Sequence, residues 1–393
     1  MSNCFTPSYS IFTHSVGYHT ASHSLLTKLN SIASAGINGV EIFTDDLYHF
    51  SQSAEFASIL ASKQVSALLT PPDSPLSQHA ALRSSSKTAT AQNKYYGAFG
   101  ECTNAEAQLE IAAAEHIKTY CDHLGLEIVC LQPLRDVEGW VSTSDRANAM
   151  ERVKSRFPIM QALNTNLLLI CSNNTPAPAT TGDHSSLVCD LTQISDMAFS
   201  FTQSTGHPIR VGFEALSWGS HIDLWAQAWS VVKATNRVNI GLILDSFNTL
   251  AREFADPCSS TAIQEPSTIT RSNLALSFKK IVAQVPGDKI FLLQIGDAKK
   301  LNKALQPSPR EGEPRPSRMI WSRSSRLFPC EKERGAFMPV EDFVKAVCDA
   351  GYTGPWSIEV FNDSLSNSSS EVPILHARRA RAGLDKLVEA VYH

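Results

Sequence analysis

Short apolar runs recur along the chain, and most are followed by a stretch in which apolar residues return every three to four positions. Such runs are typical of strands buried on both faces, and such stretches are typical of amphipathic helices. Eight runs cover residues 9–15, 39–46, 126–133, 166–173, 209–215, 240–246, 289–297 and 356–363. Helices are predicted over 23–35, 104–124, 143–163, 186–205, 221–234, 270–284, 340–350 and 374–391. Eight strands alternating with helices predict an α/β fold, a (β/α)8 TIM barrel.

Two stretches exceed what a minimal barrel needs. Residues 64–101, after the second strand, are rich in Ser, Ala, Thr and Pro, which predicts a flexible insertion. Residues 298–338, between the seventh and eighth strands, carry many Arg, Lys and Pro residues. This second stretch is a long loop on the face where barrel enzymes build their sites. The length would also fit two ordinary domains, but the strand pattern favours a single barrel domain over 1–393.

Charge, apolar runs and cysteine spacing indicate which binding partners and which cellular location to expect. The net charge is −4, and no long basic stripe is present, which argues against nucleic acid as a partner. The chain has no signal-peptide pattern and no uninterrupted run of about 18 apolar residues, so a cytoplasmic protein without a membrane partner is expected. The nine cysteines form no CxxC pair, which favours reduced thiols over disulfides or a zinc-thiolate site. A homo-oligomer is compatible with these features.

Polar side chains stand at the ends of several predicted strands. Four of them come from the last four strands, namely Glu214, Asp245, Gln294 and Glu359. A single buried carboxylate is commonly satisfied by an arginine or a backbone amide, but strands five to eight are neighbours in a barrel. Three carboxylates and an amide oxygen brought together would repel one another without a cation. We therefore predict one divalent metal ion, Mg²⁺ or Mn²⁺ from the all-oxygen ligands, with Co²⁺ or Zn²⁺ able to substitute.

Longer motifs in the same order resemble a known family. They are "HSLLTKL", "GVEIFTDDL", "LGLEIVCLQPLRDVEG", "GFEALSWGSHIDLWAQAW", "NIGLILDSFNTLAREFADP", "KIFLLQIGDA", "RMIWSRSSRLFP", "ERGAFMPV" and "WSIEVFN". On these motifs the chain resembles the fungal 3-dehydroshikimate dehydratases of quinate catabolism, within the xylose isomerase-like TIM barrel superfamily. The opening segment and the longer insertion depart from that family's usual pattern.

The resemblance implies a metal-dependent dehydration of the small molecule 3-dehydroshikimate to protocatechuate and water. It also implies that the four strand-end residues ligate the metal. Such a metal polarises the substrate ketone, a base removes the neighbouring proton, and the β-hydroxyl leaves as water.

Substrate-binding roles are expected for residues near the predicted mouth. Arg135 suits a substrate carboxylate, and a salt bridge to Asp136 or Glu138 is the alternative interpretation. Arg323 and Arg326, in the long loop, are alternative clamps for the same carboxylate. Two further substrate contacts are expected, from Trp218 and Asn248.

Three residues are expected to transfer protons or to orient the substrate. His221 follows the fifth strand by a few residues, and its alternative is an ordinary histidine at a helix start. His23 is expected either to face the mouth or to cap the first helix. Glu41 is expected either to act as acid and base or to hold an arginine.

Three other functions are alternatives to the dehydratase. A sugar or ketoacid isomerase or epimerase could use the same metal cluster, and a proton-returning lysine or histidine would favour it. A non-catalytic ligand-binding regulator would be indicated by a lost ligand, but all four are present. A DNA-repair endonuclease needs clustered histidines and a basic groove, and the sequence shows neither.

Overall fold

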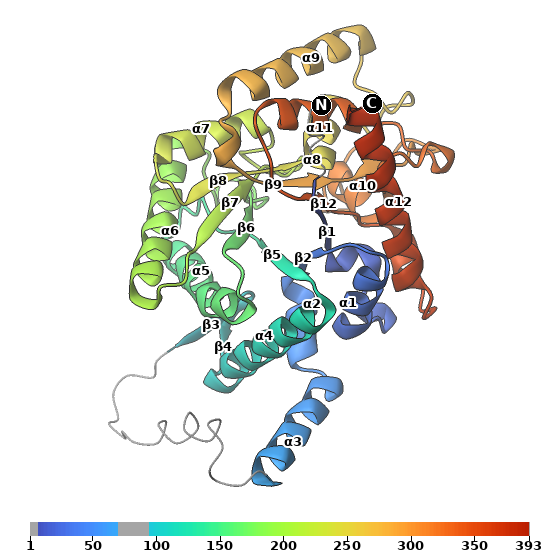
Figure 1. Cartoon of the computed structure of the whole chain (residues 1–393). Coiled ribbons are helices and arrows are strands. Elements are labelled where there is room, and N and C mark those ends of the chain that lie inside the picture. Colours follow the sequence, from blue (N-terminus) through green and yellow to red (C-terminus); the bar gives the residue numbers. More distant parts are fainter. Residues whose placement is uncertain (1–6, 70–93, 393) are drawn as a thin grey trace, which may run out of the picture.

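A computed structural model of the chain describes residues 7–69 and 94–392, and eight parallel strands close into a barrel at its centre (Figure 1). The order around the barrel is β1-β12-β9-β8-β7-β6-β5-β2. The strands are β1 (Tyr9–Phe12), β2 (Gly39–Phe43), β5 (Glu127–Leu134), β6 (Leu167–Cys171), β7 (Arg210–Glu214), β8 (Ile240–Asp245), β9 (Ile290–Ile295) and β12 (Trp356–Ile358). The predicted barrel, with its eight strands, is thereby confirmed.

Helices surround the barrel on its outer side (Figure 1). They are α1 (Leu25–Ser34), α2 (Thr44–Ser51), α3 (Ala54–Leu69), α4 (Asn104–Leu124), α5 (Thr143–Leu163), α6 (His184–Thr205), α7 (Trp225–Thr235), α8 (Ser246–Glu253), α9 (Ser267–Gln284), α10 (Ser317–Ser325), α11 (Val340–Asp349) and α12 (Val372–Tyr392). Helix α4 shows how the sequence sets such boundaries. Thr103 and Glu106 form a capping box at its start, and Gly125 ends it in the left-handed conformation. Among the described helices, none combines the length and apolar character needed to cross a membrane.

The barrel interior is filled by side chains that alternate with those facing the helices. Leu167, Leu169, Ile243 and Leu292 belong to this inner cluster. Glycines on neighbouring strands make room for it, since a Cβ at Gly212 would lie 2.4 Å from Ile243 Cδ1. The interior is therefore a packed core below the mouth, as is usual for this fold.

The two predicted extra segments contain elements of their own. Residues 70–93 of the predicted insertion lie outside the described residues, so its flexibility stays a prediction. Its end forms an unexpected hairpin of β3 (Tyr95–Gly97) and β4 (Gly100–Cys102). The long loop before β12 contains α10 and a two-stranded sheet of β10 (Asp297–Ala298) and β11 (Arg326–Leu327). This sheet carries Arg326, the first residue of β11.

Candidate active site

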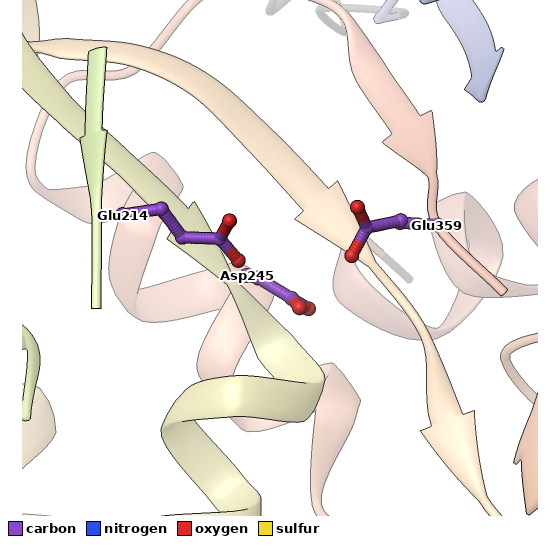
Figure 2. A group of neighbouring side chains, drawn as sticks. All are labelled: Glu214, Asp245 and Glu359. Carbon is purple, nitrogen blue, oxygen red and sulfur yellow. The ribbon is translucent and has the colours of Figure 1, made fainter. Parts of the chain in front are cut away.

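The polar residues predicted at the strand ends lie together at the carboxyl end of the barrel. Glu214 ends β7, Asp245 ends β8, and Glu359 follows β12 directly. All three side chains are buried, and one carboxylate oxygen from each lies within 4.8 Å of the others. Figure 2 shows the three carboxylates pointing toward one another from separate strands. The barrel topology thus gathers residues that are far apart in sequence into one acidic cluster.

Nitrogen donors hold two of these carboxylates in place. Asn248 Nδ2 donates to Glu214 Oε1 at 2.7 Å and to Asp245 Oδ2 at 2.8 Å, and Phe247 N donates to Asp245 Oδ1 at 2.7 Å. Helix α8 starts immediately after Asp245, so Asn248 stands on its first turn, directly beside the cluster. Asn248 was expected to contact substrate, but the structure places its amide on the two carboxylates instead.

Arg326 supplies a positive charge to the same cluster. Its Nη1 donates to Asp245 Oδ2 at 2.9 Å and to Glu359 Oε2 at 2.7 Å, while Nε donates to Ser322 Oγ at 3.0 Å. The arginine is fully buried and its guanidinium lies 4.2 Å above the Phe247 ring. Arg326 was predicted from the sequence as an alternative clamp for a substrate carboxylate, whereas in the structure its Nη1 binds two acidic residues of the protein.

Gln294 lies beside the cluster, and only the nitrogen of its side-chain amide forms hydrogen bonds within the described residues. Its Nε2 donates to Glu41 Oε2 at 2.8 Å and lies 3.5 Å from Glu359 Oε1. Its Oε1 is buried and has no hydrogen-bond partner among the described residues. An unpartnered buried acceptor costs about 1–3 kcal/mol, so this oxygen needs a cationic or donor partner. The free oxygen and the three carboxylates form a donor set suited to a hard divalent ion.

Glu41 lies under this amide and orients it. Gln132 Nε2 also donates to Glu41 Oε2, at 3.0 Å, and Ser357 Oγ donates to the other carboxylate oxygen. Burial, followed by the nearby charge of Glu359, raises the pKa of Glu41 to about 8. Glu41 is fully enclosed and holds two glutamines, and no arginine contacts it among the described residues.

Burial also makes the acidic cluster a strong proton acceptor. It raises the pKa of Glu214 well above its usual range, and the charges of Glu359 and Asp245 add to this effect. Burial raises the pKa of Asp245 to about 7, against the opposing pull of Arg326. A cluster of this kind binds either protons or a cation near neutral pH.

We therefore expect divalent metal binding to weaken on acidification. A metal ion must displace the protons held by Asp245 and Glu214. Asp245, with a pKa of about 7, takes up its proton as pH falls through about 7, and the pKa of Glu214 is raised well above its usual range in the same direction. Each displaced proton should lower the apparent affinity up to about tenfold per pH unit. Calorimetric titration of Mn²⁺ between about pH 6 and about pH 8.5 measures this slope. Affinity that is independent of pH over this interval would contradict the assignment of the site.

A cavity of about 250 Å³ opens beside the acidic cluster. Its lining includes most residues expected to meet a substrate or a metal, namely Arg135, Glu214, Trp218, Arg323, Arg326 and Glu359. The Trp218 Nε1 donor is buried and has no hydrogen-bond partner among the described residues. The cavity therefore combines an acidic end, two further arginines and an unused donor.

The two other arginines give the cavity a cationic wall. Arg323 forms no ion pair within the described part of the chain, and its guanidinium lies 4.7 Å from the centre of the Phe361 ring. Arg135 lies 3.3 Å from Asp45 and 5.7 Å from the centre of the Phe43 ring. The partner of Arg135 is thus on α2, and the salt bridge to Asp136 or Glu138 considered from sequence is wrong. Such a wall is suited to an anionic group of a ligand.

Two predicted histidines do not line this cavity. His221 precedes α7, and its Nε2 lies 3.0 Å from Thr180 Oγ1. His23 is buried before α1, with Nε2 2.8 Å from the carbonyl of Asn367, and it lines a different cavity beside α2. The cap of α1 is Ser24, so His23 does not cap this helix either.

Two residues that the sequence did not single out lie at or beside the cavity. His14 follows β1 and stacks on Tyr18, with ring centres 4.1 Å apart, and lies 5.1 Å from Phe361 of the cavity wall. Burial lowers the pKa of His14 well below its usual value, and its Nδ1 has no hydrogen-bond partner within the described residues. Cys171 ends β6 and lines the cavity, with Sγ 3.4 Å from Glu214 Oε2. Both residues stand at the end of a predicted strand, which could have identified them from the sequence. At the strand ends, however, only carboxylate and amide side chains were considered as candidates.

Comparisons with known proteins place this geometry among related barrels. A family model described as "Xylose isomerase-like TIM barrel" matches residues 94–387. A 3-dehydroshikimate dehydratase of Neurospora crassa is 31% identical over 381 residues, covering 96% of this chain and 93% of that protein. A 3-dehydroshikimate dehydratase of Pseudomonas aeruginosa is 30% identical over 351 residues, covering 89% of this chain but 38% of that longer protein. A solved "xylose isomerase-like TIM barrel/4-hydroxyphenylpyruvate dioxygenase fusion protein" has a TM-score of 0.63 and 26% identity, covering 98% of this chain and 43% of that one.

Proposed function

The chain belongs to the xylose isomerase-like TIM barrel family and is a hydro-lyase, and we propose that it converts 3-dehydroshikimate to protocatechuate and water. The resemblance to fungal 3-dehydroshikimate dehydratases noted from the motifs is confirmed by the Neurospora relative. The observation that carries the proposal is one cavity lined both by two carboxylates of the acidic cluster, Glu214 and Glu359, and by the cationic wall.

A divalent metal would be held by Glu214, Asp245, Glu359 and the free Oε1 of Gln294. The unpartnered oxygen of Gln294 and the raised pKa values of the carboxyls support this donor set. Oxygen ligands favour Mg²⁺ or Mn²⁺, and Co²⁺ or Zn²⁺ are alternatives. When bound, such an ion acts as a Lewis acid on the substrate ketone and makes the neighbouring C–H acidic.

The substrate carboxylate would bind at the cationic wall. Arg323 lacks an acidic partner within the described residues, and Arg135 is shared only with the partly exposed Asp45. Trp218 Nε1 is then available to donate to a substrate hydroxyl. With the carboxylate at the arginines, the ring carbons of the substrate would lie between the cationic wall and the acidic cluster. The arginines would then hold one end of the substrate, and the acidic cluster with its metal would face the other end.

The proton acceptor is assigned to His14. Burial lowers the pKa of His14, which favours its neutral form, Nδ1 has no hydrogen-bond partner among the described residues, and the ring centre lies 5.1 Å from that of Phe361, which lines the cavity. The groups expected from sequence, His221, Glu41 and His23, are each engaged in a hydrogen bond, whereas Nδ1 of His14 has no such partner among the described residues. Glu41 instead accepts a hydrogen bond from Gln294 Nε2 and so orients the Gln294 amide.

We expect His14→Gln to lower kcat about 100-fold or more, because a positioned general base contributes at least that factor. The matched control is His221→Gln, the same change in a histidine whose Nε2 is engaged by Thr180 Oγ1 at 3.0 Å, which should leave kcat within about twofold. Steady-state kinetics with 3-dehydroshikimate compare the two variants. The reverse order of effects would move the base back to His221.

The proposed reaction is tested by incubating purified protein with 3-dehydroshikimate and following the ultraviolet absorbance of the aromatic product. The assay is repeated after treatment with EDTA and after return of Mg²⁺ or Mn²⁺. We expect product to form, to stop forming after chelation and to form again with metal. No product from folded, metal-supplied protein would refute the dehydratase and favour an isomerase acting on another ketone.

A further inference from the structure

One arginine outside the cavity binds three backbone carbonyls at once. Arg152, on α5, donates from Nε to Ala98 O at 2.7 Å and from Nη2 to Arg135 O at 2.8 Å. Its Nη1 donates to Asp136 O at 3.2 Å. Within the described residues this guanidinium forms no ion pair with a carboxylate. Its planar fork is therefore used to fix backbone, which an ammonium group could not do in the same geometry.

Two of these carbonyls belong to the turn that carries Arg135 into the cavity. Asp136 adopts φ of 54°, a left-handed conformation that is unfavourable for a residue with a Cβ atom. The Asp136 carbonyl also accepts from Trp140 Nε1 at 3.1 Å. The side-chain contacts of Arg135 are weaker, because its ion pair with Asp45 is 3.3 Å long and partly exposed. The bonds from Arg152 thus restrain the backbone of the turn from which the Arg135 side chain projects.

The third carbonyl belongs to the tip of the β3–β4 hairpin. Ala98 is buried between the two strands, and the next residue, Phe99, packs its exposed ring 5.2 Å from the ring centre of Tyr48 on α2. One guanidinium therefore ties the hairpin to the turn at 135–136. A change in the position of either segment would be passed to the other through this contact.

We propose that Arg152 is a positioning residue that sets the direction of Arg135 and fastens the β3–β4 hairpin to the rim of the cavity. The catalytic consequence rests on the proposed function, in which Arg135 binds the substrate carboxylate. Among the described residues, Arg152 itself does not line the cavity and forms no hydrogen bond with the acidic cluster, and it reaches the cavity wall only through the carbonyls of Arg135 and Asp136. Its loss should therefore weaken substrate binding without slowing the chemical step.

Kinetics of Arg152→Ala and Arg152→Lys test this role. We expect KM for 3-dehydroshikimate to rise about tenfold in Arg152→Ala with kcat within about twofold, and less in Arg152→Lys, which retains the charge but not the fork. The matched control is Arg156→Ala, one turn further along α5, where the guanidinium binds Glu110 and not the turn. A comparable rise in KM in this control would overturn the proposal by showing a general effect of weakening α5.

A double-mutant cycle and hydrogen exchange complete the test. In an Arg135→Ala background, Arg152→Ala should leave KM unchanged, because its effect passes through Arg135. Amide exchange of residues 95–102 and 135–140 should speed up together in Arg152→Ala. A KM effect that persists without Arg135, or exchange that changes at neither segment, would overturn the proposal. If the wild type does not turn over 3-dehydroshikimate, the proposed function fails, and exchange alone still decides whether Arg152 fastens the two segments.

Discussion

Glu214→Gln is expected to abolish product formation while leaving the metal-free protein at least as stable as the wild type. The change removes one carboxylate ligand, and loss of the metal's Lewis-acid contribution should lower kcat/KM by about 10³-fold or more. Burial and the charges of Glu359 and Asp245 raise the pKa of Glu214, so its ionised form is unfavourable in the folded state. A neutral amide relieves that repulsion and should raise the free energy of unfolding by about 1–2 kcal/mol at neutral pH.

The variant should lose activity but gain stability in the metal-free state. A loss of activity caused by misfolding would instead be accompanied by a loss of stability. Kinetics, calorimetric Mn²⁺ binding and thermal unfolding after EDTA measure both effects on the same preparation. Glu138→Gln is the matched control, since Glu138 is also a buried carboxyl with a raised pKa, about 7, but lies outside the cluster. Its Oε1 accepts from Asn173 N at 2.7 Å, a bond that a glutamine oxygen can also accept. Metal-dependent turnover by Glu214→Gln at the level of the control would contradict the metal site.

Arg326→Met is expected to destabilise the metal-free protein by about 3–5 kcal/mol, because it leaves buried acidic groups without their cation. Asp245 and Glu359 both lose the Nη1 donor, and no other arginine or lysine lies within ion-pair distance of them in the described residues. A divalent ion neutralises the same carboxylates. Added Mn²⁺ should therefore recover much of the lost stability and raise the melting temperature of the variant more than that of the wild type.

Arg156→Met provides the comparison for this second prediction. Arg156 is equally buried and forms a two-bond pair with Glu110, at 2.6 and 3.0 Å, far in sequence from the acidic cluster. Arg156→Met should lower the free energy of unfolding by a similar amount. Added Mn²⁺ should stabilise this variant no more than it stabilises the wild type. Thermal unfolding with and without Mn²⁺ measures both variants. Equal metal responses in the two variants would contradict a cation site between Asp245 and Glu359.

The sequence was sufficient for the barrel and for the acidic cluster. Apolar runs that end in a single polar residue locate strand ends within a few positions, and parallel strands in a closed barrel all end on the same face. Glu214, Asp245 and Glu359 were therefore brought together correctly from local pattern and topology alone. The same reasoning located Arg135 and Arg323 at the cavity, because each lies just beyond a strand or in the loop above the mouth.

Only the tertiary structure decided what each of the longer or loop-borne side chains contacts. Arg326 pairs with two carboxylates, Asn248 holds two of them, and His221 turns away from the cavity. The hairpin at 95–102 and the guanidinium of Arg152 that fixes it had no local signal. Strand ends are placed by the local apolar run and by the barrel that the strands share, and both can be read from this sequence. Loop side chains are placed by many rotatable bonds and by partners distant in the chain, and these are settled only when the whole molecule has folded.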